Sequence, residues 1–141
     1  MPKSSKKHIH VAAALIMHRG KLLITRRPEG RHFEGMWEFP GGKLESNESL
    51  RQCLKREIRE ELGMDVSVNR RILTVQQEYD ERIVTLNFFE CACFRGSPKS
   101  LEGQEVLWVD LEDLRQYPFP PPDEKIIETL IAQKKHGYCR R

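Results

Sequence analysis

The chain has 141 residues, 32% of them charged, and a formal net charge of +3. This length favours one domain with its own hydrophobic core and is too short for two. The polar start, MPKSSKK, lacks the apolar segment of a signal peptide, and no apolar run approaches the length of a membrane span. The small positive excess suits an anionic small molecule. Much of it lies in lysines and arginines at the two ends, a pattern typical of solvated tails.

These features predict how the chain is organised. We expect a flexible tail over residues 1–7, a single domain over residues 8–136 and a C-terminal tail over residues 137–141. Four cysteines without CxxC spacing favour a reduced, cytoplasmic protein over a disulfide or zinc scaffold. We expect no membrane association and no stable nucleic-acid complex, in a monomer or a homodimer.

The first part of the domain predicts a β-hairpin. His8–Met17 is a nearly continuous apolar run, as in a strand covered on both faces. A tight turn returns the chain into a second strand over Lys21–Arg27. The polar loop Glu29–Gly35 follows and suits the rim of a site.

A short strand and two glycines come next. Met36–Phe39 (MWEF) predicts a short strand that stops at Pro40, where Gly41 and Gly42 allow a sharp turn and a close approach of the backbone to a ligand. The following segment, GKLESNESLRQCLKREIREELGM, predicts a helix that ends at Gly63. Its N-cap is expected at Ser46 or Asn47.

Acidic side chains lie on the buried side of this helix. On a helical wheel Leu50, Leu54 and Ile58 define the direction of the core, and Glu57 and Glu61 fall within the same stripe. Carboxylates in such a position are costly unless a cation neutralises them. Mg²⁺ is commonly held by a few carboxylates together with substrate phosphates. The alternative is a surface helix stabilised by glutamate–arginine pairs.

The remaining chain predicts a layered α/β fold. Asp80-Glu81 is expected to form a turn and Leu111–Gln116 one or two helical turns, and Asp123 precedes a last helix from Glu124 to about Lys135. Prolines exclude a helix over Tyr117–Pro122. The expected strands are Val66–Val68, Ile72–Gln77, Ile83–Phe94 and Val106–Val109. Strands interleaved with two sizeable helices predict an α/β domain.

The spacing within the acidic helix resembles the Nudix box. Gly42 and Glu48 are followed by Arg56-Glu57-Ile58, then Glu60-Glu61 and Gly63-Met64, and every defined position of the box is present. The resemblance implies an α/β/α sandwich with a mixed central sheet. It also implies an enzyme that hydrolyses a nucleoside diphosphate linked to a further group, with Mg²⁺ as the cofactor and Mn²⁺ as a possible substitute.

The resemblance also implies roles for particular residues. Glu57, Glu60 and Glu61 match the family's metal ligands, with the backbone carbonyl of Gly41 as a frequent addition. A polyphosphate repels hydroxide, and the attacking water must be held in line with its leaving group; divalent metals serve both needs. By its motif position, Glu57 is further expected to activate this water or to hold the metal-bound hydroxide.

Other residues are expected to support this site. Arg56 is predicted to orient the carboxylates, with Glu48 as its ion-pair partner. A further carboxylate before Trp108 often joins the site in this family. Glu102 and Glu105 both fit, and we favour Glu105.

Beyond the box, residues from about 9 to 132 resemble the MutT branch, which converts nucleoside triphosphates to monophosphate and pyrophosphate. The branch implies sanitation of oxidised nucleotides such as 8-oxo-dGTP, in support of DNA replication and repair. Asp123 stands where MutT has an asparagine, and an ionised aspartate only accepts hydrogen bonds. By position, the substrate-binding residues are expected to be Arg27, Glu38, Phe39, Tyr79 and Asp123.

Three alternatives remain at this stage. The aspartate and the proline-rich segment also resemble pyrophosphohydrolases for CTP or modified cytidine triphosphates. An acceptor at this position suits an exocyclic amine, as on cytosine, or the N1/N2 edge of guanine. A Nudix hydrolase for ADP-ribose or a related dinucleotide is a second alternative. A binding module with the same fold is a third, although such modules usually lack some of the glutamates found here.

Overall fold

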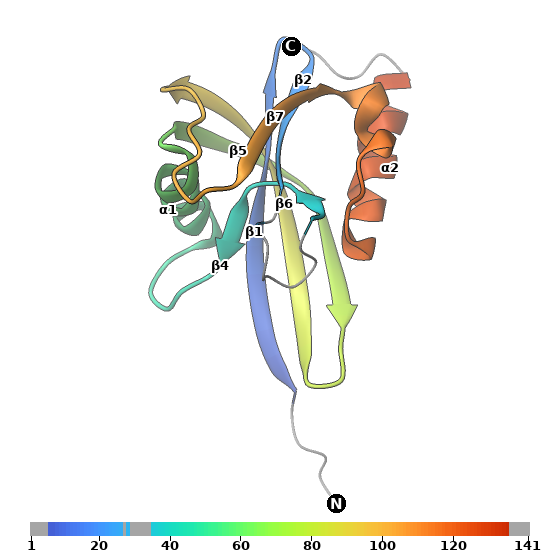
Figure 1. Ribbon diagram of the computed structural model, residues 1–141. Helices are drawn as coiled ribbons and strands as arrows, with labels where there is room; N and C mark the ends of the chain where they lie inside the picture. Colours follow the sequence, from blue (N-terminus) through green and yellow to red (C-terminus); the bar gives the residue numbers. More distant parts are fainter. Residues whose placement is uncertain (1–5, 27, 29–34, 136–141) are drawn as a thin grey trace, which may run out of the picture.

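The computed structural model describes residues 6–26, 28 and 35–135 of the chain. These residues form a mixed seven-stranded sheet with α1 on one side and α2 on the other, as Figure 1 shows. The predicted α/β/α sandwich is therefore confirmed. The elements in chain order are β1 (Lys7–His18), β2 (Lys21–Arg26), β3 (Trp37–Glu38), β4 (Gly41–Lys43), α1 (Leu50–Leu62), β5 (Asp65–Glu78), β6 (Arg82–Arg95), β7 (Glu105–Asp110), the 3₁₀ helices η1 (Leu111–Gln116) and η2 (Pro121–Asp123), and α2 (Glu124–Lys135).

Strand β1 lies at the centre of the sheet. It runs parallel to β6 from Lys7↔Arg82 to Ile16↔Cys91, and β6 is antiparallel to β5. The other edge of β1 pairs with β4 and with the start of β2, and β2 pairs in turn with β3 and β7. This pairing places β4 beside the middle of β1, where β4 also contacts α1.

The two faces of β1 belong to different cores. Ala12, Ala14 and Ile16 pack with Leu54 and Ile58 of α1 in one cluster of buried side chains. Ala13 and Leu15 point the other way and pack with η1 and α2. Successive side chains of a strand point to opposite faces, so a strand covered on both sides must be apolar throughout. The prediction from the apolar run His8–Met17 is confirmed.

The start of α1 differs from the prediction. Ser49 is the N-cap, not Ser46 or Asn47. The Ser49 hydroxyl accepts a hydrogen bond from the Gln52 N–H at 3.1 Å, and the Gln52 side chain accepts one from the Ser49 N–H at 2.8 Å. This reciprocal pair satisfies two backbone donors, whereas Asn47 adopts a left-handed turn with φ 69°. Gly63 ends the helix at φ 67°, as expected.

Two strand boundaries were also wrong. Gly41–Lys43 is strand β4, where the glycines had predicted only a turn, because these residues pair with Val11–Ala13 of β1. The predicted strands Val66–Val68 and Ile72–Gln77 are one strand, β5, whose pairing with β6 shifts register between Val68 and Leu73. Such bulges bend a strand without ending it.

No helix of the described residues is long and apolar enough to cross a membrane.

Candidate active site

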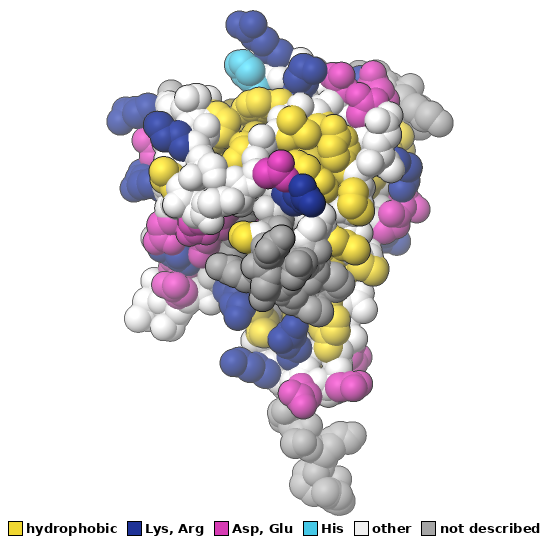
Figure 2. Space-filling model, in the orientation of Figure 1, with side chains coloured by type: hydrophobic (Ala, Val, Ile, Leu, Met, Phe, Trp, Pro, Cys, Tyr) yellow, Lys and Arg dark blue, Asp and Glu magenta, His cyan; other side chains and the backbone are white. Residues whose placement is uncertain are grey.

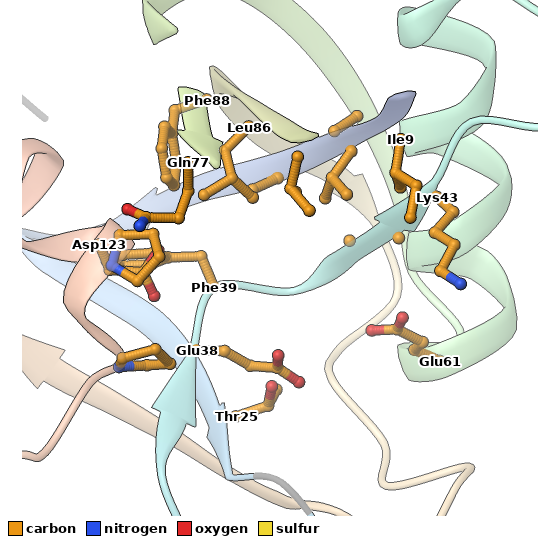
Figure 3. Close-up of a pocket in the computed structure, with 18 of the residues that line it drawn as sticks. Ile9, Thr25, Glu38, Phe39, Lys43, Glu61, Gln77, Leu86, Phe88 and Asp123 are labelled. Carbon is orange, nitrogen blue, oxygen red and sulfur yellow. The ribbon is translucent and has the colours of Figure 1, made fainter. Parts of the chain in front are cut away.

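One cavity of about 460 Å³ opens beside β1, and residues of β1, of α1 and of the segment that leads into α2 line it. Its two ends differ in chemistry, as the close-up in Figure 3 shows. Glu61 and Glu38 face each other at one end, and Gln77 and Asp123 lie at the other. The side chains of Val11, Ala13, Leu86 and Phe88 form the apolar wall between them.

The acidic end is built around Glu57 and Glu61, which follow each other by one turn of α1. Their side chains are hydrogen-bonded to each other. Burial, the hydrogen bond to Glu57 and the charges of Glu57, Glu38 and Glu102 raise the pKa of Glu61 to about 9. Two carboxylates in contact cannot both ionise readily, so they share a proton at neutral pH. A divalent cation between them would take the place of that proton, and oxygen ligands of this kind suit Mg²⁺ and related ions.

Gly42 allows β4 to lie directly against these carboxylates. A Cβ at this position would stand 2.3 Å from the Glu57 carboxyl carbon, closer than any side chain tolerates. Gly41 is equally restricted, because a Cβ there would stand 2.0 Å from the Ala12 carbonyl oxygen of β1. Both glycines line the cavity. Their small size is therefore what brings the backbone up to the acidic end.

Arg56 lies behind the carboxylates and contacts several of them. Its guanidinium donates to both carboxylate oxygens of Glu48, at 2.8 and 3.1 Å, and to Glu57 at 3.0 Å. It also reaches Glu60 at 3.3 Å and the Lys43 carbonyl at 3.3 Å. The hydrogen bond from Arg56 lowers the pKa of Glu48 to about 2. Arg56 is thus placed to orient Glu57 and to join α1 to β4.

Glu60 occupies a more open position. Its side chain is 54% exposed, it points toward Arg56, and it does not line the cavity. Among the described residues no three His, Cys, Asp or Glu side chains already surround one metal-sized point. The structure therefore pairs Glu57 with Glu61 and leaves Glu60 at their side.

For the fourth carboxylate, the residue found at the cavity differs from the one that the sequence favoured. Glu102 lines the cavity, whereas the favoured Glu105 is 61% exposed and pairs with Arg26 at 2.6 Å. Glu105 begins β7, whose register with β2 places Glu105 opposite Arg26. Glu102 instead lies in the turn before the strand, on the side of Glu61. The structure thus places Glu102, and not the favoured Glu105, at the cavity.

The opposite end of the cavity is largely apolar. Phe39 is buried, stacks on Phe119 with ring centroids 5.1 Å apart, and meets Phe88 edge-on. Tyr79 stands on the rim, with the Arg82 guanidinium 5.2 Å from the centre of its ring. The Asp123 side chain is buried at the end of η2. These residues give this end of the cavity aromatic side chains with a carboxylate beside them, features that suit the binding of a flat ring.

Some predicted residues lie elsewhere and some lining residues were not predicted. Arg27 lies outside the described residues. Lys43, Gln77, Arg82 and Gln104 line the cavity without having been expected there. Gln77 could have been found from its strand, because it stands two positions before Tyr79 and therefore faces the same side. Lys43 directly follows the two glycines, so its position was also within reach.

Acidic side chains gather on the flank that α1 forms beside the cavity (Figure 2). Glu60 belongs to this flank, and Arg59 pairs there with Asp65 at 2.7 Å. The outward face of α1 thus carries solvated pairs of an arginine with an acidic residue, Arg56–Glu60 and Arg59–Asp65, of the kind that the surface-helix alternative predicted. The inward face carries Glu57 and Glu61, which that alternative does not explain.

Comparison with known proteins agrees with this geometry. Residues 11–129 match the model of the NUDIX domain family. The chain is 40% identical over 126 residues to a CTP pyrophosphohydrolase of Escherichia coli, covering 89% of this chain and 93% of that protein. It is 39% identical over 130 residues to an 8-oxo-dGTP diphosphatase of Haemophilus influenzae, covering 91% and 95%. The solution structure of the Escherichia coli ORF135 protein superposes with a TM-score of 0.84 at 39% identity, covering 95% of this chain and 96% of that one.

The chain therefore belongs to the Nudix hydrolase family. Divalent metal ions are the usual cofactors of this family, and a nucleotide substrate fits it. Both agree with a cavity that has carboxylates at one end and aromatic side chains at the other.

Proposed function

We propose that the protein is a Mg²⁺-dependent nucleoside triphosphate pyrophosphohydrolase of MutT type, which releases a nucleoside monophosphate and pyrophosphate. The observation that carries this proposal is the two-ended cavity. Glu61 lines the acidic end and is hydrogen-bonded to Glu57, one turn earlier in α1, and Phe39, Tyr79 and Asp123 line the opposite part of the cavity. A nucleotide whose base enters that part of the cavity would direct its phosphates toward the carboxylates.

The acidic end would bind the cation through Glu57 and Glu61, with Glu60 turning in from Arg56 and the Gly41 carbonyl as an additional ligand. A bound Mg²⁺ neutralises phosphate charge and lowers the pKa of water. Glu57 is the group we expect to accept the proton of the attacking water, since Arg56 and Gly42 hold its carboxylate in place. Glu48 keeps Arg56 oriented, and Lys43 supplies a positive charge for the phosphates.

The base end would select the substrate. We infer an oxidised deoxyguanosine triphosphate, 8-oxo-dGTP, as the preferred substrate, because the Haemophilus relative carries that activity in its name. Glu38 and Arg27 are expected to contribute to binding. The cellular role would then be removal of oxidised nucleotides from the cytoplasmic pool before replication, by a single domain over residues 8–136 acting as a monomer or a homodimer.

A cytidine triphosphate is the second candidate. Asp123 favours it, because an ionised carboxylate accepts a hydrogen bond from the exocyclic amine of cytosine. The Escherichia coli relative at 40% identity is named for CTP.

The test is a substrate panel scored by kcat/KM with Mg²⁺. It contains canonical and oxidised deoxynucleoside triphosphates, CTP and its 5-methyl analogue, and ADP-ribose. Pyrophosphate release from 8-oxo-dGTP or from a cytidine triphosphate is the expected result. A preference for ADP-ribose would overturn the triphosphate assignment, and the absence of hydrolysis of any nucleotide would favour a binding module.

A further inference from the structure

The segment between β6 and β7 is fastened to the C-terminal end of α1. The Lys99 N–H donates to the Leu62 carbonyl at 2.9 Å, and the Leu101 N–H donates to the Glu61 carbonyl at 3.2 Å. Carbonyl groups in the last turn of a helix have no partner within the helix itself. The segment supplies these partners and thereby lies beside the helical turn that carries Glu61.

A single side-chain amide completes this attachment. Gln104 Nε2 donates to the Glu61 carbonyl at 3.1 Å, and Gln104 Oε1 accepts from the Glu102 N–H at 3.0 Å. Because one end of the amide meets an acceptor and the other a donor, its orientation is determined by its partners. Gln104 is 8% exposed, so both hydrogen bonds are shielded from water. The amide therefore bridges the main chains of the two glutamates, Glu61 and Glu102.

The local turn is built for this bridge. Gly103 adopts a φ of 78°, in the left-handed region that favours glycine. It reverses the chain between Glu102 and Gln104, so that the Gln104 side chain can reach back to the Glu102 N–H. The Ser100 hydroxyl also donates to the Gln104 carbonyl and Oε1. The Gln104 amide thus adds a buried restraint on Glu102 to the main-chain hydrogen bonds that Lys99 and Leu101 make with α1.

We propose that Gln104 is a positioning residue for the cation site: its amide holds Glu102 next to Glu61, so that the Glu102 carboxylate joins Glu57 and Glu61 around the bound cation. Glu102 and Glu61 both line the cavity, where two ionised carboxylates would repel each other. Lys99 and Leu101 hold the segment before Glu102 against α1, whereas the Gln104 amide holds the Glu102 main chain itself. The proposal rests on the cation site proposed above.

The test measures Mn²⁺ binding without substrate, from the electron paramagnetic resonance signal of free Mn²⁺. The variants are Gln104→Ala, Glu102→Gln and the double variant. Residues that orient a metal ligand typically alter affinity by about 10- to 100-fold. We expect each single variant to weaken Mn²⁺ binding by about tenfold or more. The double variant should bind no more weakly than Glu102→Gln alone, because Gln104 acts through Glu102.

A matched control is available on the same segment. Glu105→Gln removes a carboxylate three positions from Glu102 that pairs with Arg26 outside the cavity, and it should leave Mn²⁺ affinity unchanged. Melting temperatures of all variants separate folding from binding. If Gln104→Ala does not fold, Gln104→Met keeps the length of the side chain while removing both hydrogen bonds.

Two results would overturn the proposal. One is a Gln104 variant that is folded and binds Mn²⁺ within twofold of the unaltered protein. The other is an additive loss in the double variant, which would mean that Gln104 only stabilises the helix end. Glu57→Gln distinguishes this failure from a failure of the cation site. If Glu57→Gln also leaves Mn²⁺ binding intact, the proposed site itself is wrong.

Discussion

The two ends of the cavity are made in different ways. Most of the acidic end comes from one continuous stretch, β4 and α1, in which Gly42, Glu57 and Glu61 are brought together by a glycine strand and one helical turn, and Glu38 and Glu102 join from β3 and from the turn before β7. The base end gathers Phe39, Tyr79 and Asp123 from three separate parts of the chain. Local spacing therefore specifies the reaction class, while the substrate depends on how distant segments pack. Damage to the acidic end should lower the rate with every substrate, and damage at the base end should change the order of preference.

The largest effect is expected from Glu57→Gln. Removing a general base typically costs about 10²- to 10⁴-fold in rate. We expect a loss in kcat of that size, equal for all triphosphates, because the substituted group acts on the phosphates and not on the base. The measurement is kcat with each nucleotide of the panel, with Glu105→Gln as the carboxylate control and the melting temperature as the folding control. Full Mg²⁺-dependent activity in Glu57→Gln would contradict the role given to this residue.

Substitutions of the two neighbouring glycines should have different effects: Gly42→Ala should lower the rate, and Gly41→Ala should lower the stability. In Gly42→Ala the new methyl group would meet the Glu57 carboxylate, which can rotate away at the cost of its position. A displacement of about 1 Å can cost about 100-fold in rate. We expect that loss in kcat with a nearly unchanged melting temperature. A fully active Gly42→Ala would show that the position of Glu57 is not critical.

Gly41→Ala supplies the contrast. Its methyl group would meet the Ala12 carbonyl oxygen of β1, a backbone atom that cannot move without disturbing the sheet. Overpacking of this kind typically costs about 1–3 kcal/mol of stability, or more. The free energy of unfolding, from urea titration, should fall by at least this amount. An unchanged value would mean that β4 can move away from β1.

At the base end, Asp123→Asn should change selectivity more than rate. The asparagine adds a donor and removes the charge that favours an exocyclic amine. A hydrogen bond to a charged group is worth about 1.5–3 kcal/mol, which corresponds to about 10- to 100-fold. We expect the ratio of kcat/KM for 8-oxo-dGTP over that for CTP to rise within this range. Equal losses for both nucleotides would place Asp123 in the structural support of α2 instead.

The smallest effect concerns pH. Folded Glu61, with a pKa of about 9, holds its proton to higher pH than the unfolded carboxyl, whose pKa is near 4.5. The folded state therefore binds more protons between these values, and the stability of the metal-free protein should fall as pH rises through this range. Melting temperatures in EDTA from pH 5 to pH 9 test this expectation. Glu61→Gln should abolish this part of the pH dependence.

Metal binding should have the opposite pH dependence. A carboxylate must lose its proton before it binds a cation, so Mg²⁺ affinity should rise with pH over the same range. Calorimetry in buffers of different ionisation enthalpy should detect about one proton released per ion. Binding without proton release would mean that the ion does not replace the proton shared by Glu57 and Glu61.

Errors in the sequence-based predictions share a physical cause. Ser49 was missed as the N-cap because Ser46 and Asn47 are equally good capping residues, and only the reciprocal hydrogen bonds with Gln52 decide among them. Glu105 was preferred over Glu102 because it stands nearer to Trp108. The register of β7 with β2, a pairing of distant segments, turns Glu105 toward Arg26.

What the sequence determined by itself is the chemistry of the acidic end and the class of fold. The period of the helix places Glu57 and Glu61 on one side whatever surrounds them, and alternation along a strand makes β1 apolar on both faces. Only the tertiary structure decided which further carboxylate lines the cavity, since the Gln104 amide joins the Glu102 main chain to the Glu61 carbonyl, 43 positions before Gln104 in the chain. Gln77 of β5 and Asp123 at the end of η2 come together at one end of the cavity in the same way. The periods of a helix and of a strand can be counted along the sequence, whereas contacts between distant segments depend on the packing of the whole domain.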